Sequence, residues 1–207
     1  MITILTSLYF IACSSEIDNK PSASVQDVQE QPKVEAQPEV KEEVKADAPA
    51  FATQLTLQAG SSLEFVGAKI TGDHKGGFSA LTGSVGVTEA GAIGSVELMI
   101  DLASTFSDAE KLTGHLMSPD FFDVGQFPKA VFTSSAVTAD NITGILDFHG
   151  VKKEVTLPAS FTNTDGVQGI TAEFTINRKD WGLVYPGKPD DLIKDEVLIK
   201  AKLNFAQ

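Results

Sequence analysis

The sequence has very little cysteine and no concentrated positive charge. A single cysteine among 207 residues excludes an internal disulfide framework and any metal site built from several cysteines. The formal net charge is −12, and the densest basic spots are two pairs, Lys152-Lys153 and Arg178-Lys179. Because such a chain repels nucleic-acid phosphates, these absences exclude DNA or RNA binding through a basic patch.

The amino-terminal apolar segment is too short to cross a bilayer. Residues 2–12 are mostly apolar, but at about 1.5 Å per residue they cannot span a bilayer core of roughly 30 Å. The length is typical of a signal-peptide apolar region, so we expect a signal peptide over residues 1–12. The following Cys13 completes a sequence, Phe10-Ile-Ala-Cys-Ser14, that resembles the lipobox of bacterial lipoproteins, in which the cysteine is lipidated. The alternative is an ordinary signal peptide with an incidental cysteine.

Residues 14–50 contain no aromatic residue and no glycine, and they are rich in Gln, Glu, Pro, Val and Lys. Such a segment cannot bury enough apolar surface to offset the entropy lost on ordering. We therefore expect residues 13–50, which begin with the lipidated Cys13, to be a disordered acidic tether between a membrane and a domain. The alternative within this segment is a transient helix over residues 34–46.

Residues 51–207 alternate apolar and polar residues with the period of two that is typical of β-strands. Apolar residues at positions 170, 172, 174 and 176, for example, share one face, while polar residues take the other. The expected strands cover residues 54–59, 62–70, 77–88, 96–102, 130–138, 141–148, 155–161, 170–176 and 197–205. Antiparallel strands with one polar face favour a closed barrel or a tight sandwich, because closure removes exposed edges.

One stretch departs from the strand pattern. Residues 108–117 have helical spacing, and Ser107 or Asp108 is expected to cap the helix. The helix leads into the run 115–132, which holds four phenylalanines, while Pro119 and Pro128 forbid one continuous element. Because aromatic side chains carry a large apolar area, these residues either plug the end of a core or line the mouth of a cavity.

Few residues form patterns typical of catalysis or metal binding. His74, His115 and His149 are far apart in the sequence and have no nearby partner of ligand type. A metal-assisted enzyme that uses all three remains one hypothesis. Residues 72–77 resemble a phosphate-binding loop in composition, but no helix follows them, which favours a hairpin turn. The sequence therefore predicts a protein that is not an enzyme and holds no metal.

Several motifs together resemble one known family, the YceI-like proteins. They are Ser62-Leu-Glu-Phe-Val-Gly-Ala-Lys-Ile70 with Gly77-Phe78, the run from His115 to Phe132, Ile142-Thr-Gly-Ile-Leu146, His149-Gly-Val-Lys-Lys-Glu-Val-Thr-Leu157, and Ile176-Asn-Arg-Lys-Asp-Trp-Gly182. The resemblance covers most of residues 51–207. It implies a lipocalin-like, antiparallel, eight-stranded β-barrel with one short helix, exported to the bacterial periplasm.

The resemblance also implies a ligand, because members of the family hold a polyisoprenoid or another long-chain lipid inside the barrel. Carried over to matching positions, the expected lipid-binding residues are aromatic or lie near the aromatic run: Phe65, His115, Phe121, Phe122, Phe132, Phe148, Phe174 and Trp181. No cofactor is expected other than this non-covalently bound lipid.

The leading hypothesis is thus a membrane-anchored lipid-binding protein whose ligand is a polyisoprenoid, a quinone or a fatty-acid-like molecule. Lipidation of Cys13 would attach it to a membrane facing the periplasm. Ser14 after the cysteine favours the outer membrane in a host with two membranes. The alternative is a surface interaction module with a solidly packed barrel and no ligand. The sequence leaves open whether the protein forms a homodimer.

Overall fold

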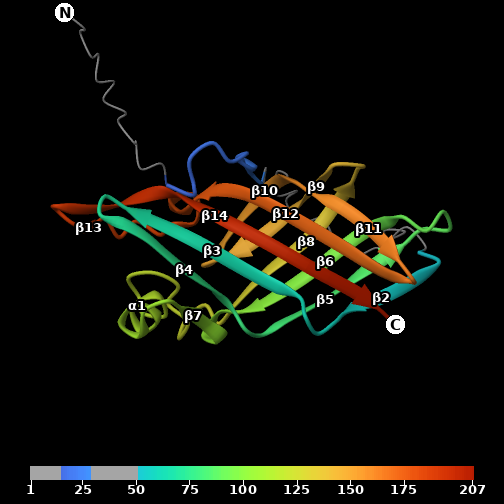
Figure 1. Cartoon of the computed structure of the whole chain (residues 1–207), viewed down its shortest axis with the longest axis horizontal. Helices are drawn as coiled ribbons and strands as arrows, with labels where there is room; N and C mark the ends of the chain where they lie inside the picture. Colours follow the sequence, from blue (N-terminus) through green and yellow to red (C-terminus); the bar gives the residue numbers. More distant parts are fainter. Residues whose placement is uncertain (1–14, 29–50) are drawn as a thin grey trace, which may run out of the picture.

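The computed structural model describes residues 15–28 and 51–207, which fold almost entirely into β-strands (Figure 1). The strands are β1 (Ser24–Asp27), β2 (Thr53–Leu57), β3 (Ser62–Lys69), β4 (Gly72–Phe78), β5 (Leu81–Val87), β6 (Ile93–Asp101), β7 (Thr105–Ser107), β8 (Lys129–Val137), β9 (Asn141–Phe148), β10 (Val151–Pro158), β11 (Ser160–Thr164), β12 (Val167–Asn177), β13 (Gly187–Lys188) and β14 (Asp191–Ala206). The helices are α1 (Glu110–Leu116) and the 3₁₀ turns η1 (Leu102–Ser104) and η2 (Arg178–Trp181). No helix within these described ranges has the length and apolarity needed to cross a bilayer.

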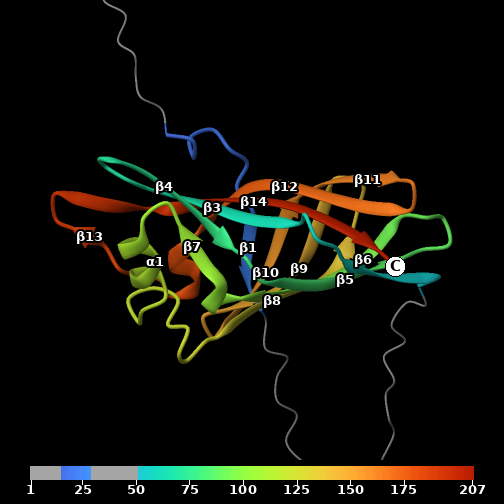
Figure 2. The same ribbon diagram turned by 60° about the horizontal axis from the view of Figure 1, so that its bottom comes forward.

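The strand pairings close into a ring of eight long antiparallel strands. Three of these are bent and appear as two segments each, namely β2 with β3, β4 with β5, and β10 with β11. The pairings run from β3 to β4, β5 to β6, β6 to β8, β8 to β9, β9 to β10, β11 to β12, β12 to β14, and from β14 back to β3. The prediction of an antiparallel eight-stranded barrel with one short helix is confirmed (Figures 1 and 2).

Alternation of side chains explains why the strands form a barrel with one core. On β12, Ile170 and Phe174 are buried, while the intervening Glu173 faces outward. Phe174 lies opposite Ile199 of β14 in the antiparallel register. Successive residues of a strand point to opposite faces, so this pattern places one apolar set inside the ring.

The structure corrects the expected hairpin turn at residues 72–77, which instead form most of β4. Gly76 lies opposite Phe65 in the register, and a Cβ atom at position 76 would come within 2.4 Å of the Phe65 ring. Glycine here makes room for an aromatic ring across the strand pair, which sequence composition alone does not distinguish from a turn. The actual turn lies at Ile70–Thr71, between β3 and β4.

The helix α1 forms inside the predicted range, but the predicted cap is wrong. The residue before the helix is Ala109, and no side chain caps its first turn. The carboxylate of Asp108 instead accepts a hydrogen bond from the backbone N–H of Lys75 at 3.0 Å and lies 2.9 Å from Nδ1 of His74. Asp108 therefore ties the start of the helix to β4 rather than capping it.

The barrel wall has a gap between β10 and the second half of β12. β11 pairs with β12 only as far as Thr171. β10 pairs with β9 and does not continue the pairing along the rest of β12. Residues 15–28, which we call the N-terminal strap, lie along the barrel, and their second half, residues 21–27, fills this gap. The N–H of Ala23 donates to the carbonyl of Thr175, and the N–H of Thr175 donates to the carbonyl of Pro21, each at 2.9 Å. β1 then continues antiparallel to β10 (Figure 2).

The expected disordered tether is thus wrong for residues 15–28. Ile17 packs on the outside of the barrel against Val66, Ala68 and Leu198, where it forms a second, smaller apolar cluster. Ala23 enters the main core. These apolar contacts, together with pairing to a distant strand, provide the stabilisation that local composition does not reveal. The signal peptide over 1–12, Cys13 and the tether and helix expected over 29–50 lie outside the described residues.

Candidate functional site: an apolar cavity inside the barrel

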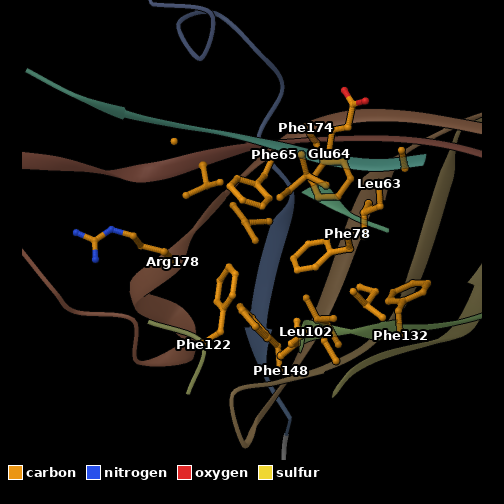
Figure 3. A pocket seen from close by; sticks show the side chains of 18 of the residues that line it. Leu63, Glu64, Phe65, Phe78, Leu102, Phe122, Phe132, Phe148, Phe174 and Arg178 are labelled. Carbon is orange, nitrogen blue, oxygen red and sulfur yellow. The ribbon is translucent and has the colours of Figure 1, made fainter. Parts of the chain in front are cut away.

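A cavity of about 350 Å³ lies inside the barrel (Figure 3). Its wall is almost entirely apolar and is built by β3, β4, β6, β8, β9, β10, β12 and β14, with further residues from η1, α1 and the loop after α1. The volume falls within the range of roughly 300–1,000 Å³ that is usual for small-molecule sites. The alternative of a solidly packed barrel is therefore wrong.

The cavity is elongated along the barrel. Ile193 and Leu203 both line it and lie near opposite ends of β14. At about 3.3 Å per residue, the strand between them is roughly 30 Å long. A long, narrow apolar space of this kind suits an extended hydrocarbon chain better than a compact ligand.

Phenylalanine rings from distant parts of the chain meet on one side of the cavity. The ring of Phe122 lies 6.3 Å from that of Phe65, 5.9 Å from that of Phe78 and 5.8 Å from that of Phe148. Figure 3 shows these rings facing a common space, whereas the carboxylate of Glu64 points away from it. Tilted and edge-on arrangements at these distances are the favoured geometries of aromatic pairs.

Six of the eight residues expected to bind lipid line the cavity, and two do not. The lining residues are Phe65, Phe121, Phe122, Phe132, Phe148 and Phe174. His115 and Trp181 do not occur among the described residues that form the wall, but each contacts residues that do. The aromatic run was expected either to plug the end of a core or to line a cavity, and for Phe121 and Phe122 the structure favours the cavity.

The position of His115 follows from the geometry of α1. Leu112 and Leu116, which lie four residues apart and therefore share a face, point into the cavity. His115 lies on a different face of the helix, where its Nε2 is 2.8 Å from the carboxylate of Asp120. Its ring packs edge-on against Phe121 and Tyr185, with ring centres 5.0 and 4.9 Å apart. His115 thus holds the aromatic loop from outside the cavity wall.

Trp181 is fully buried behind the wall. Its indole N–H donates to the carbonyl of Leu146 at 3.4 Å, and its ring centre lies 6.4 Å from that of Phe148. Its own carbonyl accepts a hydrogen bond from Nδ1 of His149 at 3.0 Å. Trp181 therefore supports two lining residues of β9 without reaching the cavity itself.

Sequence reasoning missed most of the aliphatic wall and one buried charge. The aliphatic residues could have been found from strand alternation, since they lie on the same faces as the predicted phenylalanines. Arg178 had no such signal. Arg178 is among the residues that line the cavity, and its guanidinium, which points away from the phenylalanine rings in Figure 3, donates to the carbonyls of Leu183, Ile193 and Lys194. Burial lowers the pKa of Arg178, while the nearby carboxylate of Asp195 opposes that change.

Arg178 joins three segments at one end of the cavity. Its hydrogen bonds hold the chain after η2 against the start of β14, where the pairing with β3 is irregular between Ile193 and Val197. Within residues 15–28 and 51–207, no buried side-chain nitrogen or oxygen lacks a hydrogen-bond partner. Among these residues, the buried polar side chains are therefore already satisfied by partners within the protein.

The three histidines have three separate partners in the structure. His74 pairs with Asp108, His115 with Asp120, and His149 with the backbone of Trp181. The part of the chain that the structure describes contains no group of three or more His, Cys, Asp or Glu side chains arranged to hold a metal ion. The geometry gives no support to a site formed by all three histidines.

Comparison with known proteins identifies relatives over most of the barrel. The family model for the YceI-like domain matches residues 55–205. A UPF0312 protein of Pseudomonas fluorescens is 35% identical over 114 residues, which cover 49% of this chain and 58% of the relative. A UPF0312 protein of Pseudomonas putida is 34% identical over 119 residues, with 50% and 61% covered. The chain thus spans about three fifths of the length of these curated relatives.

Solved structures share the fold. BcnA of Burkholderia cenocepacia has a TM-score of 0.62 and 26% identity, with 70% of this chain and 95% of BcnA covered. A polyisoprenoid-binding domain from Saccharophagus degradans, implicated in plant cell wall breakdown, also has a TM-score of 0.62, with 19% identity and 73% and 97% covered. A YceI protein of Campylobacter jejuni has a TM-score of 0.51 and 21% identity, with 62% and 83% covered. At these identities, the last two show the fold alone.

Proposed function

From the premise that this chain belongs to the YceI-like family, a family of binding proteins rather than enzymes, we propose that it binds a long-chain lipophile inside its barrel. The ligand class is a polyisoprenoid, a quinone or a fatty-acid-like molecule. The observation that carries the proposal is the elongated cavity of about 350 Å³, whose wall is almost entirely apolar.

Burial of hydrocarbon supplies the binding free energy in this proposal. Each methylene group removed from water contributes about 0.8 kcal/mol, so a chain of about ten methylenes gains several kcal/mol without any polar contact. The wall adds ring faces from Phe65, Phe122 and Phe148, which can pack against flat isoprenoid units. The polyisoprenoid named for the Saccharophagus degradans domain is therefore the first ligand to test, ahead of quinones and fatty acids.

We further propose that Cys13 is lipidated and anchors the protein to a membrane facing the periplasm. The support is the sequence around Cys13, which ends a short apolar segment with the residues of a lipobox. Replacement of Cys13 by serine should release the protein from the membrane fraction. Retention of the Cys13→Ser variant in that fraction would refute anchoring at this residue.

The binding proposal is tested by analysing what copurifies with the full chain. Organic extraction followed by mass spectrometry should recover a stoichiometric lipophile, and native mass spectrometry should show the same mass bound to the folded protein. Preparations that are repeatedly empty, and that also fail to take up added polyprenol, quinone or fatty acid, would contradict the proposal.

A matched pair of variants tests whether the lipophile lies in the cavity. Ala172 lines the cavity on β12, so Ala172→Phe places a ring in the space that the ligand would occupy. We expect about tenfold less copurifying lipophile, because the added ring takes up part of the apolar volume that the ligand needs. Ala136 is exposed on β8, so Ala136→Phe should leave the amount unchanged. Equal recovery from both variants would place the ligand elsewhere.

A further inference from the structure

Exposed apolar side chains gather at one end of the barrel. We call this end the barrel tip; it consists of the Ile70–Thr71 turn, the β13–β14 hairpin and residues 183–186. Ile70 is 70% exposed and Leu192 is 47% exposed, and the N–H of Ile70 donates to the carbonyl of Leu192 at 3.2 Å. Val184 is 63% exposed. Single exposed apolar residues are ordinary, whereas a group at one end indicates a contact surface.

Val184 belongs to this group through the backbone around it. The carbonyl of Pro186 accepts a hydrogen bond from the N–H of Ile193 at 3.0 Å, and the carbonyl of Leu183 accepts one from Arg178. These bonds hold residues 183–186 against the start of β14, next to Leu192. Figure 1 shows β13 and the β3–β4 turn at one end of the molecule, opposite the carboxyl terminus.

The N-terminal strap begins at the same tip. The hydroxyl of Ser15 donates to the carboxylate of Asp73 at 3.0 Å, and Glu16 pairs with Lys75 at 2.8 Å. Both partners belong to β4, just after the Ile70–Thr71 turn. Cys13 precedes Ser15 by two residues, and two residues span at most about 7 Å. A lipid attached to Cys13 would therefore start beside the tip, not at the far end of a long tether.

Residues that line the cavity extend to this end as well. Lys69, His74 and Ile193 line the cavity and are only half-buried. Lys69 directly precedes Ile70, and Ile193 directly follows Leu192. The exposed apolar group, the start of the strap and one end of the cavity thus lie at the same end of the barrel.

We propose that the barrel docks on a phospholipid bilayer through this tip, with Ile70, Val184 and Leu192 in the lipid interface and the acyl chains of Cys13 beside them. The docking surface rests on the lipidation of Cys13 in the proposed function. A net charge of −12 gives no general attraction to anionic lipids, so the contact is apolar in character. In this orientation the end of the cavity that Lys69 and Ile193 line lies toward the bilayer.

Single cysteines with an environment-sensitive fluorophore test the orientation. The acylated full chain is reconstituted into vesicles of phosphatidylethanolamine and phosphatidylglycerol, with or without brominated lipid as a quencher. Ile70→Cys and Leu192→Cys report on the tip, and acylation of Cys13 leaves each introduced thiol as the one that is labelled. Val167→Cys is the control, because Val167 is also exposed, at 38%, but lies at the β11–β12 turn toward the opposite end (Figure 1).

Brominated lipid should quench roughly half of the fluorescence at positions 70 and 192, because interfacial side chains lie about 5–10 Å into the boundary, and should leave position 167 unchanged. Equal quenching at all three positions, or none at 70 and 192, overturns the docking orientation.

Intact-mass measurement separates the two proposals. Acylated protein that carries a lipophile but shows no tip quenching overturns docking alone. Protein that is not acylated overturns the anchor and with it the docking, while copurifying lipophile still supports binding in the cavity.

Discussion

Phe122 is the residue that links the aromatic loop to the barrel strands. Its ring contacts those of Phe65 on β3, Phe78 on β4 and Phe148 on β9. Aromatic pairs of this kind contribute about 0.5–1.5 kcal/mol beyond the area that they bury. We expect Phe122→Ala to lower the free energy of unfolding by about 3 kcal/mol. Urea denaturation of protein freed of lipid measures this loss.

Phe106 provides the matched control for Phe122. It lies on β7 and is about half exposed, with its ring over Gly77 rather than in the cavity. Phe106→Ala should therefore lower the free energy of unfolding by less than about 1 kcal/mol. Equal losses of unfolding free energy for Phe106→Ala and Phe122→Ala would show that the ring contacts of Phe122 stabilise the fold no more than an exposed ring does.

The site residues that could be predicted are those that stand in a distinctive stretch of the local sequence. Phe121 and Phe122 were found because phenylalanines between prolines must bury their rings somewhere. The side of the wall on which His115 lies could not be predicted, because a shift of one residue along a helix changes the face by about 100°. Arg178 could not be found, because its partners are backbone carbonyls from residues 183–194, and their positions depend on the tertiary fold.

At the level of elements, the barrel strands were predictable and the strap was not. A period of two marks most of the long strands but not β4, and β9 was predicted at its observed bounds, Asn141–Phe148. The strap has a polar composition, and its strand β1 pairs with β10, more than a hundred residues away. Local sequence cannot report a gap in a barrel wall that exists only after β10 and β12 have formed.

Ile17 should hold the strap on the barrel. Burial of an isoleucine side chain contributes about 1.5–3 kcal/mol, and Ile17 is buried against Val66, Ala68 and Leu198. Ile17→Asp removes this contribution and places a charge on an apolar surface. We expect backbone amides of residues 15–28 to exchange with deuterium about tenfold faster or more, because local opening becomes less costly. Hydrogen–deuterium exchange with mass spectrometry measures the change.

A second aspartate in the same strap separates packing from charge. Val28 follows β1 and is 42% exposed, so Val28→Asp adds the same charge without removing a buried side chain. Exchange across residues 15–28 should remain close to that of the unaltered protein. If Ile17→Asp left the exchange equally slow, the apolar contact under the strap would not be what holds it.

For the molecule as a whole, the strap is also fastened by charge. Glu16 pairs with Lys75 and Lys200, Asp18 pairs with Lys194, and Lys20 pairs with Glu173 of β12. Hydrogen bonds from Lys200 and Lys75 lower the pKa of Glu16 from its usual value of 4.5 to about 2. The pKa of Asp18 and that of Glu173 are lowered as well, chiefly by hydrogen bonds from Lys194 and Lys20. The protein therefore prefers these carboxylates in their charged form.

A lowered pKa means that the ion pairs of Glu16 stabilise the folded protein above about pH 4.5 and lose this effect as the pH falls toward 2. The unaltered protein should thus have a higher urea midpoint than Glu16→Gln at pH 7, and the difference should shrink as the pH is lowered through that window. High salt should reduce the difference at pH 7, because these groups are partly exposed. Glu89→Gln is the control, since Glu89 is exposed in the β5–β6 turn and forms no ion pair with the described residues. A difference for Glu16→Gln that stayed constant from pH 7 to pH 2 would mean that its charge does not fasten the strap.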